Sequence, residues 1–276
     1  MFNLFGFEIR VRRGAIIGWG LGLAAFAFIY LPFYPSVQEQ FSGISFEDIA
    51  LYQALGSFNM ATFEGYFAST VLQFFAVLFA IYAVVNGTAT LAGEEDAGTL
   101  ELLAAMPLRR GQIVVAKALA MVVSGLFILA IASLFVMAAV AFVASQVEIE
   151  ITPIEAVPAV WNSLPITICF MMISLFLGAF LPNRRIAATV GTVVVIGSYF
   201  GTNLVGLIES LEPLKPFLPF NYYSATAEIF TEGIVWSDAL ILLVAAAVFL
   251  LLAVLAFRRR NLTVGAWPWQ RNRIPT

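Results

Sequence analysis

The sequence contains no histidine and a single cysteine, Cys169. Without histidine the chain cannot build a His-ligated metal site, a histidine general base or a Ser-His-Asp triad. One thiol cannot close a disulfide within the chain, and its apolar neighbours indicate that Cys169 is a small core side chain. Charged residues are also scarce: they make up 11% of the 276 residues, whereas soluble domains contain about 25%.

Hydrophobic residues make up 61% of the chain, so lipid is its expected solvent. A helix needs about 20 apolar residues to cross a hydrocarbon core ~30 Å thick. Six stretches are long enough, namely 15–33, 66–92, 113–144, 160–181, 186–208 and 235–257. The first is longer than the apolar core of a signal peptide, so we expect it to be retained. Because lipid-exposed strands cannot satisfy their hydrogen bonds, the predicted fold is one all-α transmembrane domain over residues 1–276.

The basic residues lie almost entirely in the loops and termini on one side of the membrane that the six stretches are expected to cross. That side holds 13 of the 14 lysines and arginines, and the other side holds only Lys215. The positive-inside rule therefore predicts that both termini are cytoplasmic. The outer segment 209–234 is rich in proline and aromatic residues, and we expect it to be re-entrant, dipping into the outer leaflet. A surface loop with an aromatic anchor is the alternative.

The cytoplasmic loop between the second and third stretches is predicted to be a docking element. Gly98 permits a sharp turn, and Thr99 can cap the helix that follows. Leu100 and Leu103 share one face of that short helix, and Pro107 marks its end. An apolar helix on the cytoplasmic side must be buried against something. The candidates are another part of this protein, a separate cytoplasmic protein, and the lipid surface. The residues assigned to the element are Glu94, Glu95, Gly98, Thr99, Leu100, Glu101, Leu103, Pro107, Arg109 and Arg110.

The stretch 93–120, G-E-E-D-A-G-T-L-E-L-L-A-A-M-P-L-R-R-G-Q-I-V-V-A-K-A-L-A, resembles the signature of type-2 ABC exporter permeases. That family shows an acidic pair, a Gly-Thr-Leu-Glu core, a proline, a basic pair and a lysine that opens the third span. The match is closest to the subgroup of sodium-export, bacitracin-resistance and nitrous-oxide-reductase maturation permeases. The resemblance implies that residues 94–110 contain a coupling helix that docks on an ATPase subunit.

No phosphate-binding motif G-x-x-x-x-G-K-[ST] occurs in the sequence, and no soluble stretch could hold a nucleotide-binding domain. We therefore expect this chain to bind no cofactor or metal, and a partner ATPase to bind ATP and Mg. The expected complex contains two ATPase copies, this chain, and a second copy of it or a paralogue. It would lie in a prokaryotic plasma membrane, in contact with lipid and not with nucleic acid.

Small residues four positions apart let helices approach closely in lipid. Gly18 and Gly22 in the first stretch, with Gly197 and Gly201 in the fifth, could pack within one subunit or between two. The resemblance also implies that the first, second and fifth spans surround the transport pathway. Polar residues at candidate lining positions are Gln73, Asn86, Tyr199 and Asn203. Each of them could instead make a hydrogen bond between helices.

Two other functions fit a protein with six spans. A secondary transporter or ion channel usually carries charged residues inside its spans, and here the centres of the six stretches carry none. An intramembrane enzyme would need a metal site or an acid–base pair, for which the spans provide neither histidine nor paired carboxylates. An ATP-driven exporter is therefore the favoured function, while the substrate stays open.

The charge distribution makes a testable prediction about topology. In a Cys169→Ala background, Lys215→Cys should react with a membrane-impermeant maleimide added outside the cell, and a cysteine at position 109 should not. The reason is that basic residues are retained on the cytoplasmic side. Labelling of position 215 only from the cytoplasmic side would contradict this topology.

Overall fold

The computed structural model describes residues 2–41, 62–94, 98, 108–205 and 208–259. All regular secondary structure in these ranges is helical. Six helical runs are long and apolar enough to cross a membrane, namely Asn3–Gln40, Phe63–Gly93, Arg110–Ala144, Ala156–Phe180, Arg184–Val205 and Trp236–Arg259. The predicted all-α fold with six membrane-crossing helices is confirmed.

The first two spans consist of several helical elements in succession. The first contains α1 (Phe2–Tyr30), η1 (Leu31–Phe33) and α2 (Tyr34–Phe41); the second contains α4 (Phe63–Phe67), η3 (Ala68–Leu72), α5 (Gln73–Thr88) and η4 (Ala89–Gly93). Both η3 and η4 are turns of π-helix, a form that is common at functional positions in helices. Because α1 begins at Phe2, the charged segment ahead of the apolar run at residue 15 is helical as well.

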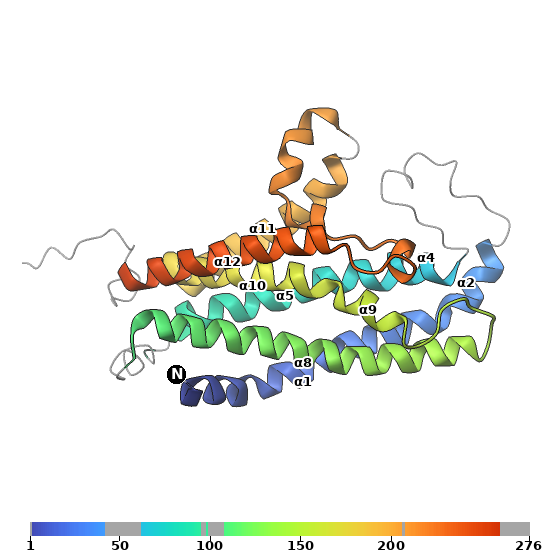
Figure 1. Cartoon of the computed structure of the whole chain (residues 1–276), viewed down its shortest axis with the longest axis horizontal. Helices are drawn as coiled ribbons and strands as arrows, with labels where there is room; N and C mark the ends of the chain where they lie inside the picture. Colours follow the sequence, from blue (N-terminus) through green and yellow to red (C-terminus); the bar gives the residue numbers. More distant parts are fainter. Residues whose placement is uncertain (1, 42–61, 95–97, 99–107, 206–207, 260–276) are drawn as a thin grey trace, which may run out of the picture.

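The other four spans are α8 (Arg110–Ala144), α9 followed by α10 (Ala156–Trp161 and Ser163–Phe180), α11 (Arg184–Val205) and α12 (Trp236–Arg259). Figure 1 shows α8 running along α1, while α10 packs against both α5 and α12. α10 is mostly buried and includes Cys169, as predicted, whereas α11 and α12 are mostly exposed. Their outward side chains are apolar, as lipid-facing helices require: Val193 and Leu251 are each 64% exposed.

Glycine allows α5 and α10 to cross at close range. A Cβ atom built on Gly87 would lie 2.6 Å from the Cβ of Ser174 and 3.1 Å from the backbone oxygen of Met171. A Cβ atom on Gly178 would lie 3.3 Å from the backbone oxygen of Thr88. In lipid, helices associate through such close van der Waals contact rather than through a hydrophobic driving force. This crossing therefore holds the second and fourth spans together.

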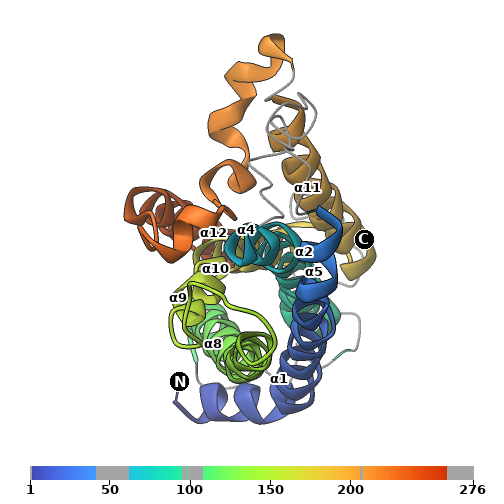
Figure 2. The same cartoon turned by 90° about the vertical axis from the view of Figure 1, so that its right-hand side faces the viewer.

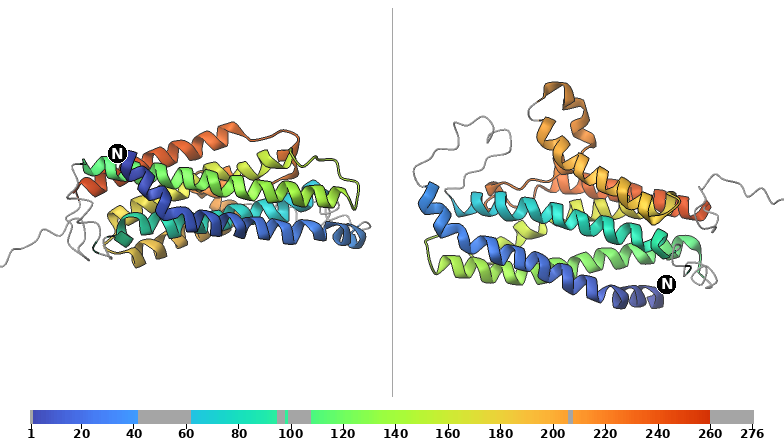
Figure 3. Two further views of the ribbon diagram at one scale, coloured as in Figure 1. Left: turned by 90° about the horizontal axis from the view of Figure 1, so that it is seen from below. Right: turned by 180° about the vertical axis from the view of Figure 1, so that it is seen from behind.

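The segment after α11 leaves the bundle and then returns to it. α11 packs against α5 and α10, but its end and η5 (Glu209–Phe217) project away from the other helices, as Figure 2 and the right-hand view of Figure 3 show. The chain then comes back through η6 (Pro219–Tyr222) and η7 (Ala227–Phe230), which contact several helices of the bundle. The outer segment is therefore part of the packed structure over much of its length.

Aromatic residues of the outer segment fall into an exposed and a packed group. Phe217 is 80% exposed, whereas Phe220 is only 6% exposed and meets the ring of Tyr199 at 5.4 Å. The hydroxyl group of Tyr223 donates a hydrogen bond to the carbonyl of Leu72, at the end of η3, at 2.7 Å. The sequence expectation treated these aromatics alike, but several of them hold the outer segment on the bundle. Its entry into the outer leaflet stays a prediction.

The close crossing of α5 and α10 can be tested with one added methyl group. Gly87→Ala should destabilise the protein by about 1–3 kcal/mol, because overpacking forces the two helices apart. Gly6→Ala is the matched control, since Gly6 also lies in a helix but has nothing within 4 Å of its Cβ position. Thermal unfolding in detergent should show a lower Tm for Gly87→Ala alone; equal Tm values for the two variants would contradict the prediction.

Candidate functional site

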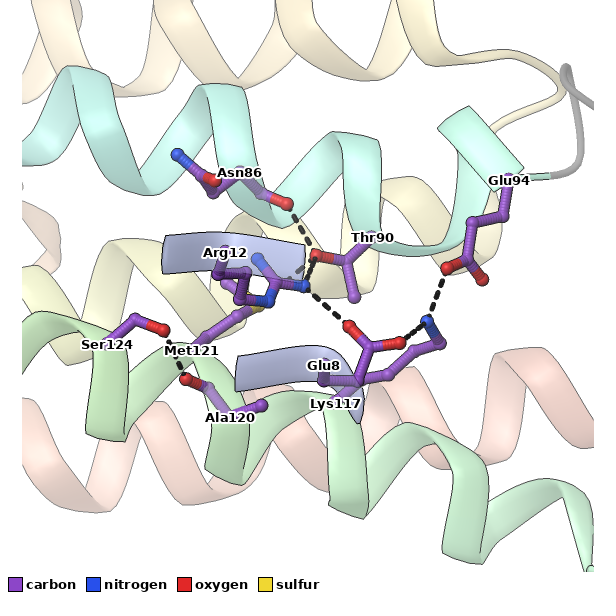
Figure 4. Close-up of polar contacts among 9 residues, drawn as sticks. All are labelled: Glu8, Arg12, Asn86, Thr90, Glu94, Lys117, Ala120, Met121 and Ser124. Carbon is purple, nitrogen blue, oxygen red and sulfur yellow. Dashed lines mark hydrogen bonds and ion pairs between the residues drawn. The ribbon is translucent and has the colours of Figure 1, made fainter. Parts of the chain in front are cut away.

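Four charged side chains meet in the interior, where the start of α1, the end of the second span and the start of α8 come together. The Nζ atom of Lys117 lies 2.5 Å from Glu8 Oε1 and 2.6 Å from Glu94 Oε1. Arg12 completes the group, with its Nη2 atom 3.2 Å from Glu8 Oε2. We refer to Glu8, Arg12, Glu94 and Lys117 as the ionic cluster (Figure 4).

Three helical segments contribute to the ionic cluster through simple local spacing. Glu8 and Arg12 are one turn apart on α1, so that they share one face. Lys117 lies near the start of α8, and Glu94 directly follows η4. One turn before Glu94, Thr90 accepts a hydrogen bond from Arg12 Nη2 at 2.8 Å and donates one to the carbonyl of its own helix at Asn86. The second span is thus held at Thr90 and again at Glu94.

Burial makes the charge balance of the ionic cluster important. Lys117 is 0% exposed, Glu8 4% and Arg12 8%. Moving a charge out of water is costly unless an opposite charge or a hydrogen bond compensates it, and here two acids face two bases. Burial raises the pKa of Glu94, and the positive charge of Lys117 opposes that shift. The arrangement suits a structural joint, in which each ion is held by a partner from another helix.

The structure describes four of the ten residues assigned to the predicted docking element. Glu94 belongs to the ionic cluster, and Gly98 has φ of 71°, the left-handed conformation that its predicted turn uses. The backbone N–H of Arg109 donates to the side chain of Gln112 at 3.0 Å and so caps α8, which begins at Arg110. The other six lie outside the described residues: Glu95, Thr99, Leu100, Glu101, Leu103 and Pro107. The role of the element stays a prediction.

Two of the four candidate pathway residues form a hydrogen bond with each other. The side-chain amide of Gln73 on α5 donates to the hydroxyl of Tyr199 on α11 at 3.3 Å, linking the second and fifth spans. Asn86 and Asn203 instead each donate to a carbonyl one turn earlier in their own helix, both at 3.0 Å. The bond between Gln73 and Tyr199 is the interhelical kind that the sequence left open as an alternative.

The four candidate interface glycines also differ in their surroundings. A Cβ atom added to Gly18, Gly22 or Gly197 would have nothing within 4 Å, so the helix faces at these three positions are open on this subunit. Gly201 packs inside the subunit, with its Cβ position 3.1 Å from Leu218. The first three leave room for another helix, and their place in a subunit interface stays a prediction.

Sequence reasoning missed Glu8, Arg12 and Thr90 as parts of a site. The basic residues near the N-terminus entered the sequence expectations through the positive-inside count and, as a group, as candidate partners of the acids before Gly98. One signal was present: Glu8 and Arg12 are spaced by four residues, as ion pairs on helices are. Lys117 and Glu94, the other two members of the ionic cluster, lie far from Glu8 and Arg12 in the sequence. No helical spacing could therefore indicate that these residues meet.

Comparison with known protein families agrees with this architecture. The model of a family described as ABC-2 family transporter protein matches residues 2–262, which include the whole ionic cluster and the predicted docking element. No curated protein matches the chain.

Because the charges of the ionic cluster balance, removing one acid should lower the stability of the protein considerably. Glu8→Gln should lower the free energy of unfolding by about 3–5 kcal/mol, because a buried positive charge loses its partner. The matched control is Glu148→Gln at an exposed position, which should change it little. Thermal unfolding in detergent would compare the two variants; the prediction fails if Glu8→Gln is as stable as the control.

Proposed function

The chain belongs to the ABC-2 transporter family, and on this basis we propose that it is the membrane-spanning permease subunit of an ATP-driven exporter. The observation that carries the proposal is the family match over residues 2–262 of a chain with six membrane-crossing helices. A phosphate-binding motif is absent from the 276-residue sequence, so the proposal assigns ATP and Mg to a separate ATPase subunit.

Docking of that ATPase is assigned to residues 94–110. Support comes from both ends of this segment, each of which is joined to a helix of the bundle. Glu94 is bound to buried Lys117, and Arg109 caps the long helix α8. A docking element has to be supported in this way if a force applied to it is to reach the spans. The positive-inside rule predicts that the same end of the bundle lies in the cytoplasm, where ATP is available.

A membrane dimer with two ATPase subunits is the proposed assembly. The open helix faces at Gly18, Gly22 and Gly197 support it, because they allow a second subunit to approach α1 and α11 closely. Gln73 and Tyr199 on the second and fifth spans are then polar, uncharged candidates for the pathway. Such a pathway suits an amphipathic cargo moving outward across a prokaryotic plasma membrane.

The docking assignment is tested by the double variant Leu100→Asp and Leu103→Asp. Burying one leucine contributes roughly 1.5–3 kcal/mol, and anchors at the centre of an interface contribute most of the binding energy. The variant should therefore lose the ATPase on co-purification, while its amount in the membrane fraction stays at the wild-type level.

Glu101→Gln provides the matched control for the double variant. A charge in the first turn of a helix contributes about 0.3–1 kcal/mol, so this control should keep most ATPase binding. If the double aspartate variant recovers the ATPase at wild-type yield, residues 94–110 are not the docking element. A helix that rests on lipid would give that result together with weaker membrane contact.

A further inference from the structure

We propose that Glu94 and Lys117 form a joint through which movement of the docking element is passed to the first and third spans. The inference rests on the proposed function, because it requires an ATPase that moves residues 94–110. Lys117 acts here as a positioning residue. It touches neither nucleotide nor cargo, and it works by keeping the loop and two helices together.

The geometry of Lys117 supports this role. Its Nζ atom bridges two carboxylates from different segments, Glu8 of α1 at 2.5 Å and Glu94 of the loop at 2.6 Å. The Lys117 side chain is fully buried, and the Glu94 side chain, at 26% exposed, lies toward the surface. The contact therefore runs from a partly exposed residue of the loop, through a buried ammonium group, to the first span.

Charge balance gives the joint its strength. With Glu94 in place, the ionic cluster contains two negative and two positive groups. If the loop withdrew Glu94, then Glu8 would be the one acid left in the ionic cluster against Lys117 and Arg12, leaving one buried positive charge of the cluster in excess. Because an uncompensated buried charge is costly, the helices that carry Lys117 and Arg12 move with the loop rather than separate from it.

The position of the joint determines what it moves. α1 and α8, which carry Arg12 and Lys117, pack along one another (Figure 1). Thr90 in the π-turn η4 is tied to Arg12 on the same side. A π-turn is a local departure from regular helix, so the end of the second span can adjust there while both ties hold. A pull on Glu94 is thereby delivered to the pair of α1 and α8.

Three variants separate this role from a simple contribution to stability. Glu94→Gln and Lys117→Met each remove one partner and leave the cluster unbalanced. The double variant with both changes removes one negative and one positive charge, so that Glu8 and Arg12 remain as a balanced pair. Its thermal stability should recover relative to Lys117→Met. The connection between the loop and α8 stays broken in the double variant.

The readout is the movement of the outer side in response to ATP. The permease, as Cys169→Ala with a reporter Phe217→Cys at an 80% exposed position, is reconstituted in nanodiscs with the ATPase that co-purifies with the wild-type chain. The rate of labelling by a membrane-impermeant maleimide is then measured without nucleotide and with ATP and vanadate. Glu148→Gln in the same background is the control for a change of charge elsewhere.

The expected result is a change in labelling rate on adding ATP and vanadate for the reporter protein and for Glu148→Gln. The labelling of the double variant is compared with that of the reporter protein at an equal amount of bound ATPase, and its rates should be equal with and without nucleotide. A normal response in the thermally recovered double variant overturns the joint. If the reporter protein itself binds no ATPase or does not respond to ATP, the proposed function is overturned and the joint with it.

Discussion

Lys117 carries an ammonium group at a place that water does not reach, and much of the surrounding structure follows from that constraint. A buried cation needs anions within contact distance, and Glu8 and Glu94 meet this need from two other segments. Arg12 forms an ion pair with Glu8 and also donates a hydrogen bond to Thr90. The first, second and third spans are therefore held in one relative position at this end of the bundle.

Elsewhere the solvent is lipid, and the packing follows different rules. Close approach at Gly87 and Gly178 holds the second span against the fourth, without any charge. Outward positions of α12 carry large apolar side chains such as Leu251, which in water would form a large exposed apolar surface. In lipid those side chains cost little, so α11 and α12 can remain mostly exposed.

The six spans were predictable because crossing a hydrocarbon core sets a strict requirement on length and apolar content. The ionic cluster was not, because a charge count by side of the membrane says nothing about which charges pair. Glycines show the same limit: Gly18 and Gly201 both follow a small-residue spacing, yet only Gly201 packs within the subunit. Likewise Phe217 and Phe220 are three residues apart, and only the second is buried. In each pair the difference depends on how distant segments approach, which local sequence does not encode.

The contacts between the first and second spans differ in kind along the length of the bundle. At the opposite end from the ionic cluster, Tyr66 donates to the carbonyl of Tyr30 at 2.7 Å, and the rings of Tyr34 and Phe63 meet at 5.1 Å. Aromatic rings tolerate a range of offsets and tilts, so they can slide while keeping most of their contact. Two short charged contacts to one ammonium group tolerate far less displacement. The first and second spans are therefore joined by buried ionic contacts at one end, and by aromatic packing with a hydrogen bond at the other.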